Sequence, residues 1–300
     1  MTKRVPRKPA GSHENQPLLF DLPASKTVEP KVRLIERPLW TEDKARLIQR
    51  YLFYFVLVTR HGTYLDGFAG PQDPANPDTW AARLVLESEP RWLRHFYFFE
   101  KSNAGESALL GLRDAQPSRP KRTISIQKGD FNAEVLKLLQ SETIKPREAT
   151  FCLLDQRTFE CRWETVKALA QYKTPKIELF YFLPNLWLDR ALSALKDRAV
   201  FNGWWVRPDD FHSIREMNQT RRMLLVLERF RSELGYLSAK AWPILERRGS
   251  GHIMYYMIHA TDHPAAPLLM GRAYRAVVAP SRRDPLEQLV LACVEGQLPN

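Results

Sequence analysis

The stretch TYLDGFAGPQ, residues 63–72, decides how this chain is interpreted. A short apolar segment runs into a turn that contains Gly67 and Gly70, and α/β proteins often hold a nucleotide-like cofactor at such a turn. Gln72 stands where a loop of this kind often carries another glycine. The stretch therefore indicates a cofactor loop if the rest of the chain supplies a matching fold.

Short apolar runs recur along the chain and alternate with helical segments. The segments between them, such as TWAARLVLESE and NAEVLKLLQSE, are long enough for one crossover helix each. We expect five strands, at Thr63–Asp66, Phe96–Glu100, Thr123–Gln127, Thr150–Asp155 and Ile177–Leu183. Alternating strands and helices predict a mainly parallel sheet.

The end of the predicted domain follows a different pattern. Two strand-like stretches, Lys240–Glu246 and His252–Ala260, flank RRGSG, which is a hairpin signal. A dinucleotide-binding fold would more often continue with parallel units, whereas Rossmann-like methyltransferases finish with such an antiparallel pair. The sequence therefore predicts an α/β, Rossmann-like class I methyltransferase fold: a mainly parallel sheet with a C-terminal antiparallel hairpin and a helical insertion.

Composition divides the chain into a tail, a core and an insertion. Residues 1–38 are rich in Pro, Lys and Arg without sustained periodicity, so we expect a disordered tail. Residues 39–300 form the methyltransferase-like domain, and a hydrophobic content of 44% is enough to bury a sizeable core. Residues from about 204 to 234 exceed a simple connection and are interpreted as the helical insertion.

Charge and cysteine content narrow the class of partner and the compartment. The formal net charge of +11 favours an acidic partner, and nucleic acid comes ahead of membrane because no apolar run nears the roughly 18 residues that a span needs. Cys152, Cys161 and Cys293 form no CxxC pair and no even-numbered set, which is typical of a reducing compartment. Without the apolar core of a signal peptide, we expect a cytoplasmic protein.

Polar residues end the predicted strands in an order that fits S-adenosylmethionine. The small residues of the first turn let the backbone approach the methionine part, and Glu100 can accept both ribose hydroxyls. Asp130 can accept from the adenine amino group while Phe131 stacks on the ring. The candidate cofactor-binding residues are Asp66, Gly67, Phe68, Ala69, Gly70, Glu100, Asp130 and Phe131. Each of the acids is alternatively a turn former or a helix cap.

The candidate catalytic residues follow the fourth predicted strand. Asp155 ends that strand beside the place of methyl transfer, and Arg157 follows in the same loop. The Asn/Asp-Pro-Pro-aromatic element of DNA amino-methyltransferases is missing. Cys161 lacks the Pro-Cys setting of a cytosine-C5 nucleophile and is interpreted as a semi-buried thiol. The histidines near the hairpin form no convincing metal cluster, so no metal is expected.

Arginines and tryptophans of the predicted insertion are candidates for contact with nucleic acid. Arg215, Arg221 and Arg222 can bind phosphates, and Trp204 can stack on an unpaired base. The alternative is a solvated helix face with the tryptophans in the core, because acidic residues are interspersed and arginine stems commonly cover apolar surface.

One apolar island, QPLLFDLP, interrupts the tail. Gln16, Leu19 and Phe20 in it resemble the Q-x-x-L-F pattern by which bacterial replication and repair proteins bind the sliding clamp. Alternatively, the island folds back onto the domain. A sliding clamp is therefore one hypothesis for a partner of this segment.

Several segments resemble the three-Cys-motif partner proteins, the TcmP family. They are the strand that ends at Asp155 and the stretches WTEDKARLIQRYL, YLDGFAGP, IELFYFLPN and IMYYMIHATDHP, within roughly residues 40–275. The resemblance implies a class I methyltransferase fold, a prokaryotic or phage cassette of mobile or defensive character, and a three-Cys-motif protein as partner. The family's reaction is poorly defined, so the resemblance sharpens the fold more than the function.

Two departures from the family pattern lie at the predicted cofactor site. The opening motif usually ends in A-G-P-G but here ends with Gln72, and the fourth strand usually continues as D-P-F-G but here reads DQRTF from Asp155. The glutamine side chain can point outward or fill the methionine space. Loss of D-P-F-G removes a tight turn at the reaction centre, so degenerate or repurposed binding is an alternative.

Three functions are consistent with the sequence. The leading hypothesis is transfer of a methyl group from S-adenosylmethionine to nucleic acid or a nucleic-acid-associated partner. The second is a non-catalytic, methyltransferase-like subunit that binds a nucleotide or a partner protein. The third is a different nucleotide-using enzyme.

Overall fold

The computed structural model describes residues 43–195, 198–245 and 252–278. Its strands are β1 (Gly62–Asp66), β2 (Leu93–Glu100), β3 (Thr123–Lys128), β4 (Thr150–Leu154), β5 (Glu178–Pro184), β6 (Ser238–Leu245) and β7 (Ile253–Thr261). Its helices are α1 (Lys44–Thr59), α2 (Ala81–Glu87), α3 (Asn103–Asp114), α4 (Phe131–Gln140), α5 (Trp163–Gln171), α6 (Leu186–Ala194), α7 (Arg198–Trp205), α8 (Phe211–Glu216), α9 (Gln219–Ser232) and α10 (Ala266–Val278). Every strand that the sequence predicts is present.

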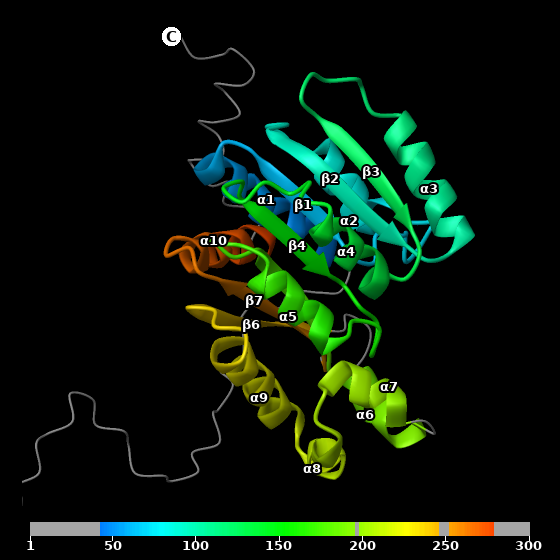
Figure 1. The fold of residues 1–300 in the computed structure, drawn as a ribbon, viewed down its shortest axis with the longest axis vertical. Helices are drawn as coiled ribbons and strands as arrows, with labels where there is room; N and C mark the ends of the chain where they lie inside the picture. Colours follow the sequence, from blue (N-terminus) through cyan, green and yellow to red (C-terminus); the bar gives the residue numbers. More distant parts are fainter. Residues whose placement is uncertain (1–42, 196–197, 246–251, 279–300) are drawn as a thin grey trace, which may run out of the picture. The chain divides into compact units, whose positions relative to one another are not determined.

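The strands form one sheet in the order β3-β2-β1-β4-β5-β7-β6 (Figure 1). Among the described strands, β7 runs antiparallel to the other six, and its neighbours are β5 and β6. The predicted Rossmann-like methyltransferase fold, a mainly parallel sheet with a C-terminal antiparallel pair, is confirmed. The chain builds outward from β1 to β3 and then returns to place β4 on the other side of β1, so a topological switch point lies between β1 and β4.

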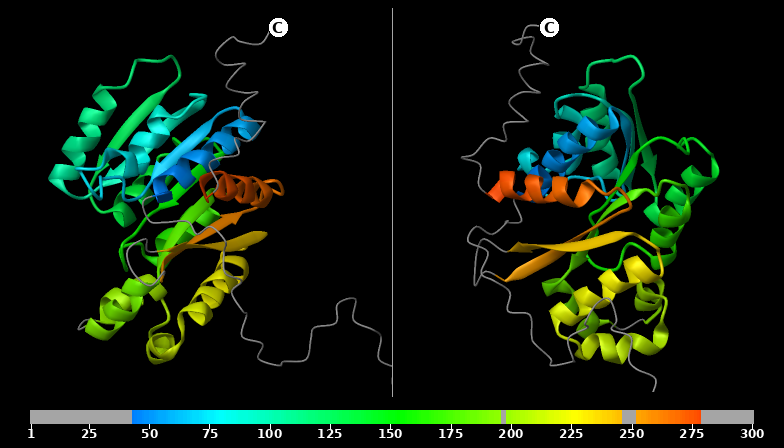
Figure 2. Two further views of the ribbon diagram at one scale, coloured as in Figure 1. Left: turned by 180° about the vertical axis from the view of Figure 1, so that it is seen from behind. Right: turned by 90° about the vertical axis from the view of Figure 1, so that its left-hand side faces the viewer.

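Helices cover both faces of the sheet (Figure 2). One hydrophobic cluster joins α1, α2, α3 and α10 to the sheet, and another joins α4, α5 and the helices α6 to α9. Successive strand residues enter opposite clusters, as Tyr64 and Leu65 of β1 do. Strands β1, β4 and β5 are buried on both faces, which explains why they read as continuous apolar runs.

A buried polar network attaches α1 to the sheet. Glu178 of β5 accepts hydrogen bonds from Tyr51 of α1 and from Thr261 of β7, and its Oε1 lies 2.9 Å from His259 Nε2. Burial and the charge of Glu178 raise the pKa of Tyr51 well above its ordinary value, so its hydroxyl remains a donor. The network fixes the orientation of α1 and with it the position of Lys44 in the first turn of that helix.

Four helices, α6 to α9, lie between β5 and β6 and gather together in Figure 1. The segment predicted as the insertion, about 204–234, covers the end of α7 together with α8 and α9. Phe201 and Trp205 of α7 are buried in the same hydrophobic cluster as Phe211 of α8 and Phe230 of α9. Tertiary packing, which sequence periodicity does not display, therefore joins α7 to α8 and α9.

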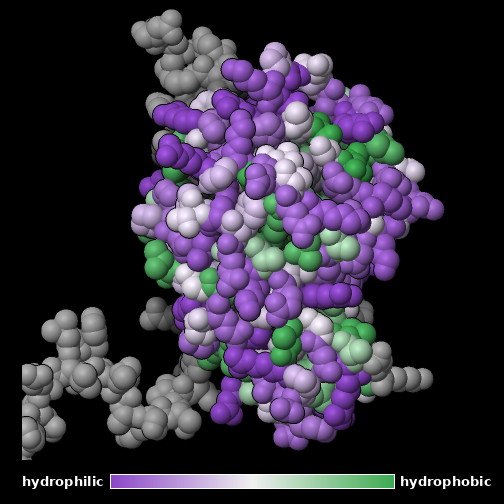
Figure 3. Space-filling view, viewed as in Figure 1, coloured by the Kyte–Doolittle hydropathy of each residue, from purple (hydrophilic) through white to green (hydrophobic). Residues whose placement is uncertain are grey.

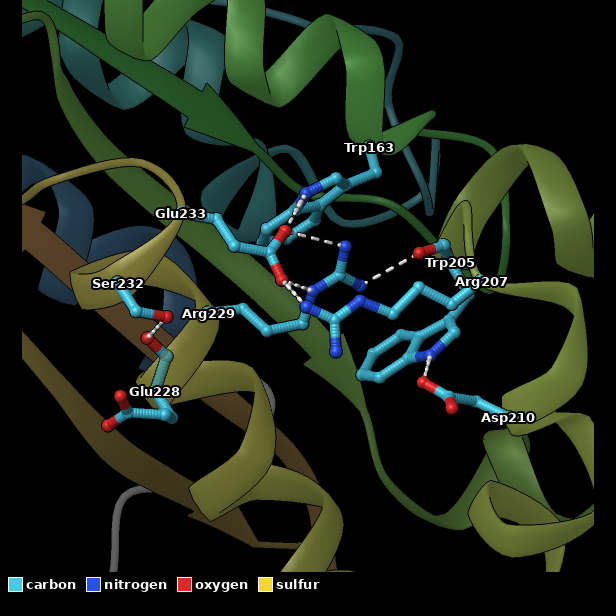
Figure 4. Close-up of polar contacts among 8 residues, drawn as sticks. All are labelled: Trp163, Trp205, Arg207, Asp210, Glu228, Arg229, Ser232 and Glu233. Carbon is cyan, nitrogen blue, oxygen red and sulfur yellow. Dashed lines mark hydrogen bonds and ion pairs between the residues drawn. The ribbon is translucent and has the colours of Figure 1, made fainter.

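A cation–π sandwich fixes this insertion to α5 (Figure 4). The Arg229 guanidinium lies 3.9 Å from the ring centre of Trp163 and 4.3 Å from that of Trp205. Glu233 accepts hydrogen bonds of 2.8 and 2.9 Å from Arg229 and one of 2.9 Å from the Trp163 indole. Arg207 forms an ion pair with the same carboxylate. One charged side chain from α9 thus joins α5 and α7.

Some predictions fall on residues that the structure does not describe. They concern the tail of residues 1–38, the clamp-like residues Gln16, Leu19 and Phe20, and Cys293.

The face shown in Figure 3 is mostly hydrophilic, and its hydrophobic residues form separate small patches. In the described ranges, no helix is both long enough and apolar enough to cross a membrane.

Candidate functional site

The loops that follow β1, β2, β3 and β4 open into a cleft of about 1210 Å³. Helix α7 of the insertion supplies a further wall. Small-molecule sites typically measure about 300–1,000 Å³, so this cleft has room for a cofactor and part of a second molecule. It lies at the switch point of the sheet, where open α/β sheets bind their ligands.

The Glu100 carboxylate, at the end of β2, is held in the cleft by two backbone N–H groups. Its Oε2 accepts from Gly70 N at 3.0 Å, and its Oε1 accepts from Ser102 N at 2.6 Å. A Cβ atom on Gly70 would lie 2.2 Å from Oε2, and one on Gly105 would lie 2.6 Å from the carboxyl carbon. The two glycines therefore form a cradle that side chains would fill, and the carboxylate retains lone pairs for further donors.

Asp66 ends β1 but does not line the cleft. Its side chain is buried, accepts from the Tyr64 hydroxyl at 3.0 Å, and accepts from Phe68 N at 3.3 Å. Burial, followed by the charge of nearby Asp155, raises the pKa of Asp66 to about 7. Asp66 therefore shapes the turn after β1 from beneath instead of facing a ligand.

The other residues of the turn after β1 either line the cleft or lie buried beneath it. Gly67, Phe68 and Gly70 line the cleft, whereas Ala69 does not. Ala69 is buried, donates its N–H to the Phe99 carbonyl at 3.0 Å, and accepts from the Trp80 indole at 2.7 Å. These bonds tie the turn to the end of β2 and to the start of α2, so Ala69 supports the turn.

Asp130 and Phe131 stand at the start of α4 and line the cleft. Asp130 caps the helix, because its Oδ1 accepts from Asn132 N at 2.8 Å. Its side chain is also exposed to the cleft, so the capping and binding roles are compatible. Phe131 is 4% exposed and packs on the rings of Phe68 and Phe99. Little of the Phe131 ring is left to stack on a base.

Asp155, the predicted catalytic carboxylate, is held by two side chains. Lys44 Nζ lies 2.8 Å from its Oδ1 and 2.7 Å from its Oδ2. Gln72 Nε2 donates to Oδ2 at 3.0 Å, and Lys44 Nζ lies 3.5 Å from Gln72 Oε1. Gln72 therefore points inward, toward the predicted reaction end of the cleft.

Sequence reasoning did not find Lys44. It contacts a carboxylate 111 residues away, and no local motif marks such a pair. Its Nζ also lies 5.0 Å from the ring centre of Phe182 and 5.2 Å from that of Tyr255, which adds cation–π attraction. The sequence around it, TEDKARLIQR, is rich in charged residues, so nothing local marks Lys44 as a buried lysine.

A glutamine holds the loop after β4, at the place where the resembled family has a tight turn. Gln156 is buried, donates to the Phe182 carbonyl at 3.3 Å, and accepts from Cys161 N at 3.0 Å. Arg157 is exposed and lines the cleft. Burial raises the pKa of the Cys161 thiol far above its usual value, so this cysteine is a core residue and no nucleophile.

Two predicted nucleic-acid contacts are instead core residues. Trp204 is 2% exposed, and its indole donates to the Tyr181 hydroxyl at 2.8 Å. Arg222 is 5% exposed and donates to the Met217 carbonyl. The predictions for Trp204 and Arg222 are corrected, because the insertion folds these side chains inward. Their neighbours Arg215 and Arg221 are exposed but do not line the cleft.

Lys101, Glu160 and Arg162 also line the cleft, whereas the histidine of β7 does not. His259 belongs to the Glu178 network in the core. In the part of the chain that the structure describes, no group of three His, Cys, Asp or Glu side chains could hold a metal ion.

This chain has distant similarity to solved structures. No protein-family model and no curated protein matches the sequence. The methyltransferase domain of bacterial CtHen1-CN shares 13% identity over 72% of this chain and 99% of its own, with a TM-score of 0.40. TYW2 of P. horikoshii, in complex with MeSAdo, shares 11% identity over 74% of this chain and 64% of its own, with a TM-score of 0.35. A Listeria monocytogenes protein with a provisional assignment as a class I S-adenosylmethionine-dependent methyltransferase shares 12% identity. The match covers 78% of this chain and 69% of that protein, with a TM-score of 0.38.

Proposed function

We propose that this protein binds S-adenosylmethionine in the cleft and is a methyltransferase-like protein that acts on nucleic acid or a nucleic-acid-associated partner. The observation that carries the proposal is the Glu100 carboxylate in its cradle of Gly70 and Gly105. A carboxylate at the end of the second strand can accept both hydroxyl hydrogens of a ribose. The fold alone supports many functions, so the proposal rests on this site.

The TcmP resemblance and the charge support the choice of target. The resemblance implies a prokaryotic or phage cassette of mobile or defensive character, with a three-Cys-motif protein as partner. The formal net charge of +11 favours an acidic target such as nucleic acid. We include membership of that family and the nucleic-acid target in the proposal.

Each part of the cleft would hold a different part of the cofactor. Glu100 would bind the ribose, Asp130 would accept from the adenine amino group, and the backbone at Gly67 and Gly70 would lie along the methionine part. When bound, S-adenosylmethionine supplies an electrophilic methyl group. Asp155, oriented by Lys44 and Gln72, would accept a hydrogen bond from the group to be methylated, and Arg157 in the same loop would orient the substrate.

Calorimetric titration with S-adenosylmethionine and with S-adenosylhomocysteine tests the proposal. Both ligands should bind and raise the melting temperature by mass action. Glu100→Ala should weaken binding by roughly 1.5–3 kcal/mol, the usual loss for a hydrogen bond to a charged group. Glu216→Ala removes an exposed carboxylate of α8 that does not line the cleft and should leave the affinity unchanged. If saturating ligand gives no heat of binding and no shift in the melting temperature, the cofactor assignment is wrong.

A non-catalytic role is the second candidate, and the surroundings of Asp155 favour it. Lys44 and Gln72 engage both of its oxygens, so the carboxylate is committed to side chains of the protein itself. The cleft would then bind a nucleotide, or the chain a partner protein, without methyl transfer.

Gln72→Gly, which restores the glycine typical of the resembled family, separates the two candidates. If Gln72 fills the methionine space, adenosine and S-adenosylhomocysteine should bind the wild type equally well, and the variant should gain affinity for S-adenosylhomocysteine alone. If the methionine space is open, the wild type should already prefer S-adenosylhomocysteine. Titration of both ligands into both proteins measures the difference.

A further inference from the structure

One part of the cleft has no role in holding the cofactor. It is the part between the loop after β4 and helix α7, and it is lined by Arg157, Arg162, Ala199, Val200 and Gly203. The cleft of about 1210 Å³ exceeds the roughly 1,000 Å³ of large small-molecule sites, so space remains beside a cofactor. The chemistry of this remaining space indicates what it binds.

Two arginines give this part of the cleft a positive charge. Arg157 and Arg162 are both exposed on its wall. Within residues 43–195, 198–245 and 252–278, neither guanidinium has an ion-pair partner.

Two acids lie in the same loop as these arginines. Lys44 holds Asp155, and Glu160 accepts a hydrogen bond of 2.6 Å from Thr158 N. Two guanidinium forks that face solvent in a concave site match the oxygens of phosphate groups.

Helix α7 offers a small, apolar surface beside these arginines. Val200 is 45% exposed, and Gly203 presents no side chain. A Cβ atom on Gly203 would meet only the Arg162 Cγ, at 3.9 Å, so the helix leaves the arginine stem uncovered. An apolar wall next to a cationic edge is suited to a flat ring that carries a phosphate, because the ring packs on the wall while the phosphate meets the guanidinium groups.

We infer that this part of the cleft binds a phosphate-bearing nucleotide, either free or within a single strand. Arg157 and Arg162 contact its phosphates, and α7 packs against its sugar and base. The inference rests on the proposed function, since the nucleotide is the target of that function. Enzymes that modify a base act on a nucleotide taken out of the duplex, and a pocket of this size beside the cofactor agrees with that requirement.

Binding to the full chain, saturated with S-adenosylhomocysteine, tests the inference. The probes are uridine 5′-monophosphate, uridine, and a fluorescein-labelled single strand of about ten nucleotides. Arg157→Gln and Arg162→Gln should each weaken binding of the phosphate-bearing probes by about tenfold. Each should also lower the salt dependence of strand binding by about one unit of slope. Arg272→Gln removes an exposed arginine of α10 outside the cleft and should change neither quantity.

A second pair of variants tests the role of α7. Gly203→Phe should fill the space beside Arg162 and abolish binding of every probe that the wild type binds. Gly203→Ala adds one methyl group in ordinary contact and should retain binding. A free nucleotide as target predicts binding of the monophosphate alone, and a strand as target predicts binding of the oligonucleotide as well.

The outcomes also separate this inference from the proposed function. Unchanged binding in both arginine variants, or equal affinity for uridine and its monophosphate, overturns the inference. If S-adenosylhomocysteine binds but neither phosphate-bearing probe does, the inference fails and the cofactor site stands. If S-adenosylhomocysteine gives no heat, the proposed function fails, and the same titrations without it still decide whether the arginines bind a nucleotide.

Discussion

At the scale of single residues, the cradle around Glu100 can be tested by adding one methyl group. In Gly70→Ala the new Cβ would lie 2.2 Å from Glu100 Oε2, so the carboxylate must move. We expect the affinity for S-adenosylhomocysteine, measured by calorimetry, to fall about tenfold or more. Gly111→Ala is the matched control, because its Cβ meets nothing within 4 Å in α3. It should keep the affinity and raise the free energy of unfolding by about 0.5–1 kcal/mol.

Asp66 predicts a pH dependence of stability. Because burial raises its pKa from 3.8 to about 7, the folded state keeps a proton that the unfolded state loses over this range. The corresponding stability is complete below pH 3.8 and is lost as the pH rises through about 7. The loss is on the order of 4 kcal/mol. Urea unfolding between pH 4 and pH 8 should show a smaller decline for Asp66→Asn, which cannot ionise. If the wild type and Asp66→Asn lose the same free energy of unfolding between pH 4 and pH 8, Asp66 does not cause the decline.

The candidate site was predictable where strand ends determine it. Glu100, Asp130 and Asp155 follow strands whose apolar runs are plain in the sequence, so the fold brings them to one edge of the sheet. The direction of the Gln72 side chain and its contact with Lys44 were not predictable, because they depend on how α1 packs across the sheet. Single-residue contacts of this kind arise from the fold and not from local patterns.

At the scale of elements, burial on both faces made the central strands easy to predict. The insertion was harder, because its helices carry arginines and tryptophans that suit a surface as well as a core. The aromatic side chains of α7 and the Arg229 guanidinium are enclosed together in the core, which a count of charges cannot reveal. Packing between helices therefore overrode the surface interpretation of Trp204 and Arg222.

The sandwich around Arg229 predicts how the insertion can be loosened. Arg229→Met removes the cation between Trp163 and Trp205 and leaves Glu233 without its main partner. We expect a loss of about 1–3 kcal/mol in the free energy of unfolding, because Glu233 is partly exposed and keeps Arg207 as a partner. Hydrogen exchange should quicken in α7 and α9 more than in α1 and α10. Arg221→Met, at an exposed position of the same helix, should change neither measurement.

At the scale of the whole molecule, the tail motif predicts a partner that the folded core does not need. A peptide of residues 12–24, which contains Gln16, Leu19 and Phe20, should bind a bacterial sliding clamp at about micromolar affinity, near −8 kcal/mol. Leu19→Ala and Phe20→Ala should each abolish binding, and a scrambled peptide is the control. Deletion of residues 1–30 should leave the melting temperature unchanged. If the peptide does not bind the clamp and the truncated chain has a lower melting temperature, this segment packs on the domain.

The strand order also constrains the way the chain acquires its structure during synthesis. Strand β6 leaves the ribosome before β7, yet among the strands that the structure describes it pairs with β7 alone, and β7 lies between β6 and β5. A nascent chain that stops before Ile253 therefore has five joined parallel strands, an open edge on β5 and one strand with nowhere to pair. The last strand made must insert between two earlier ones, so completion of the sheet is a late step that depends on distant contacts. Until then, the open edge of β5 is exposed to pairing with other chains.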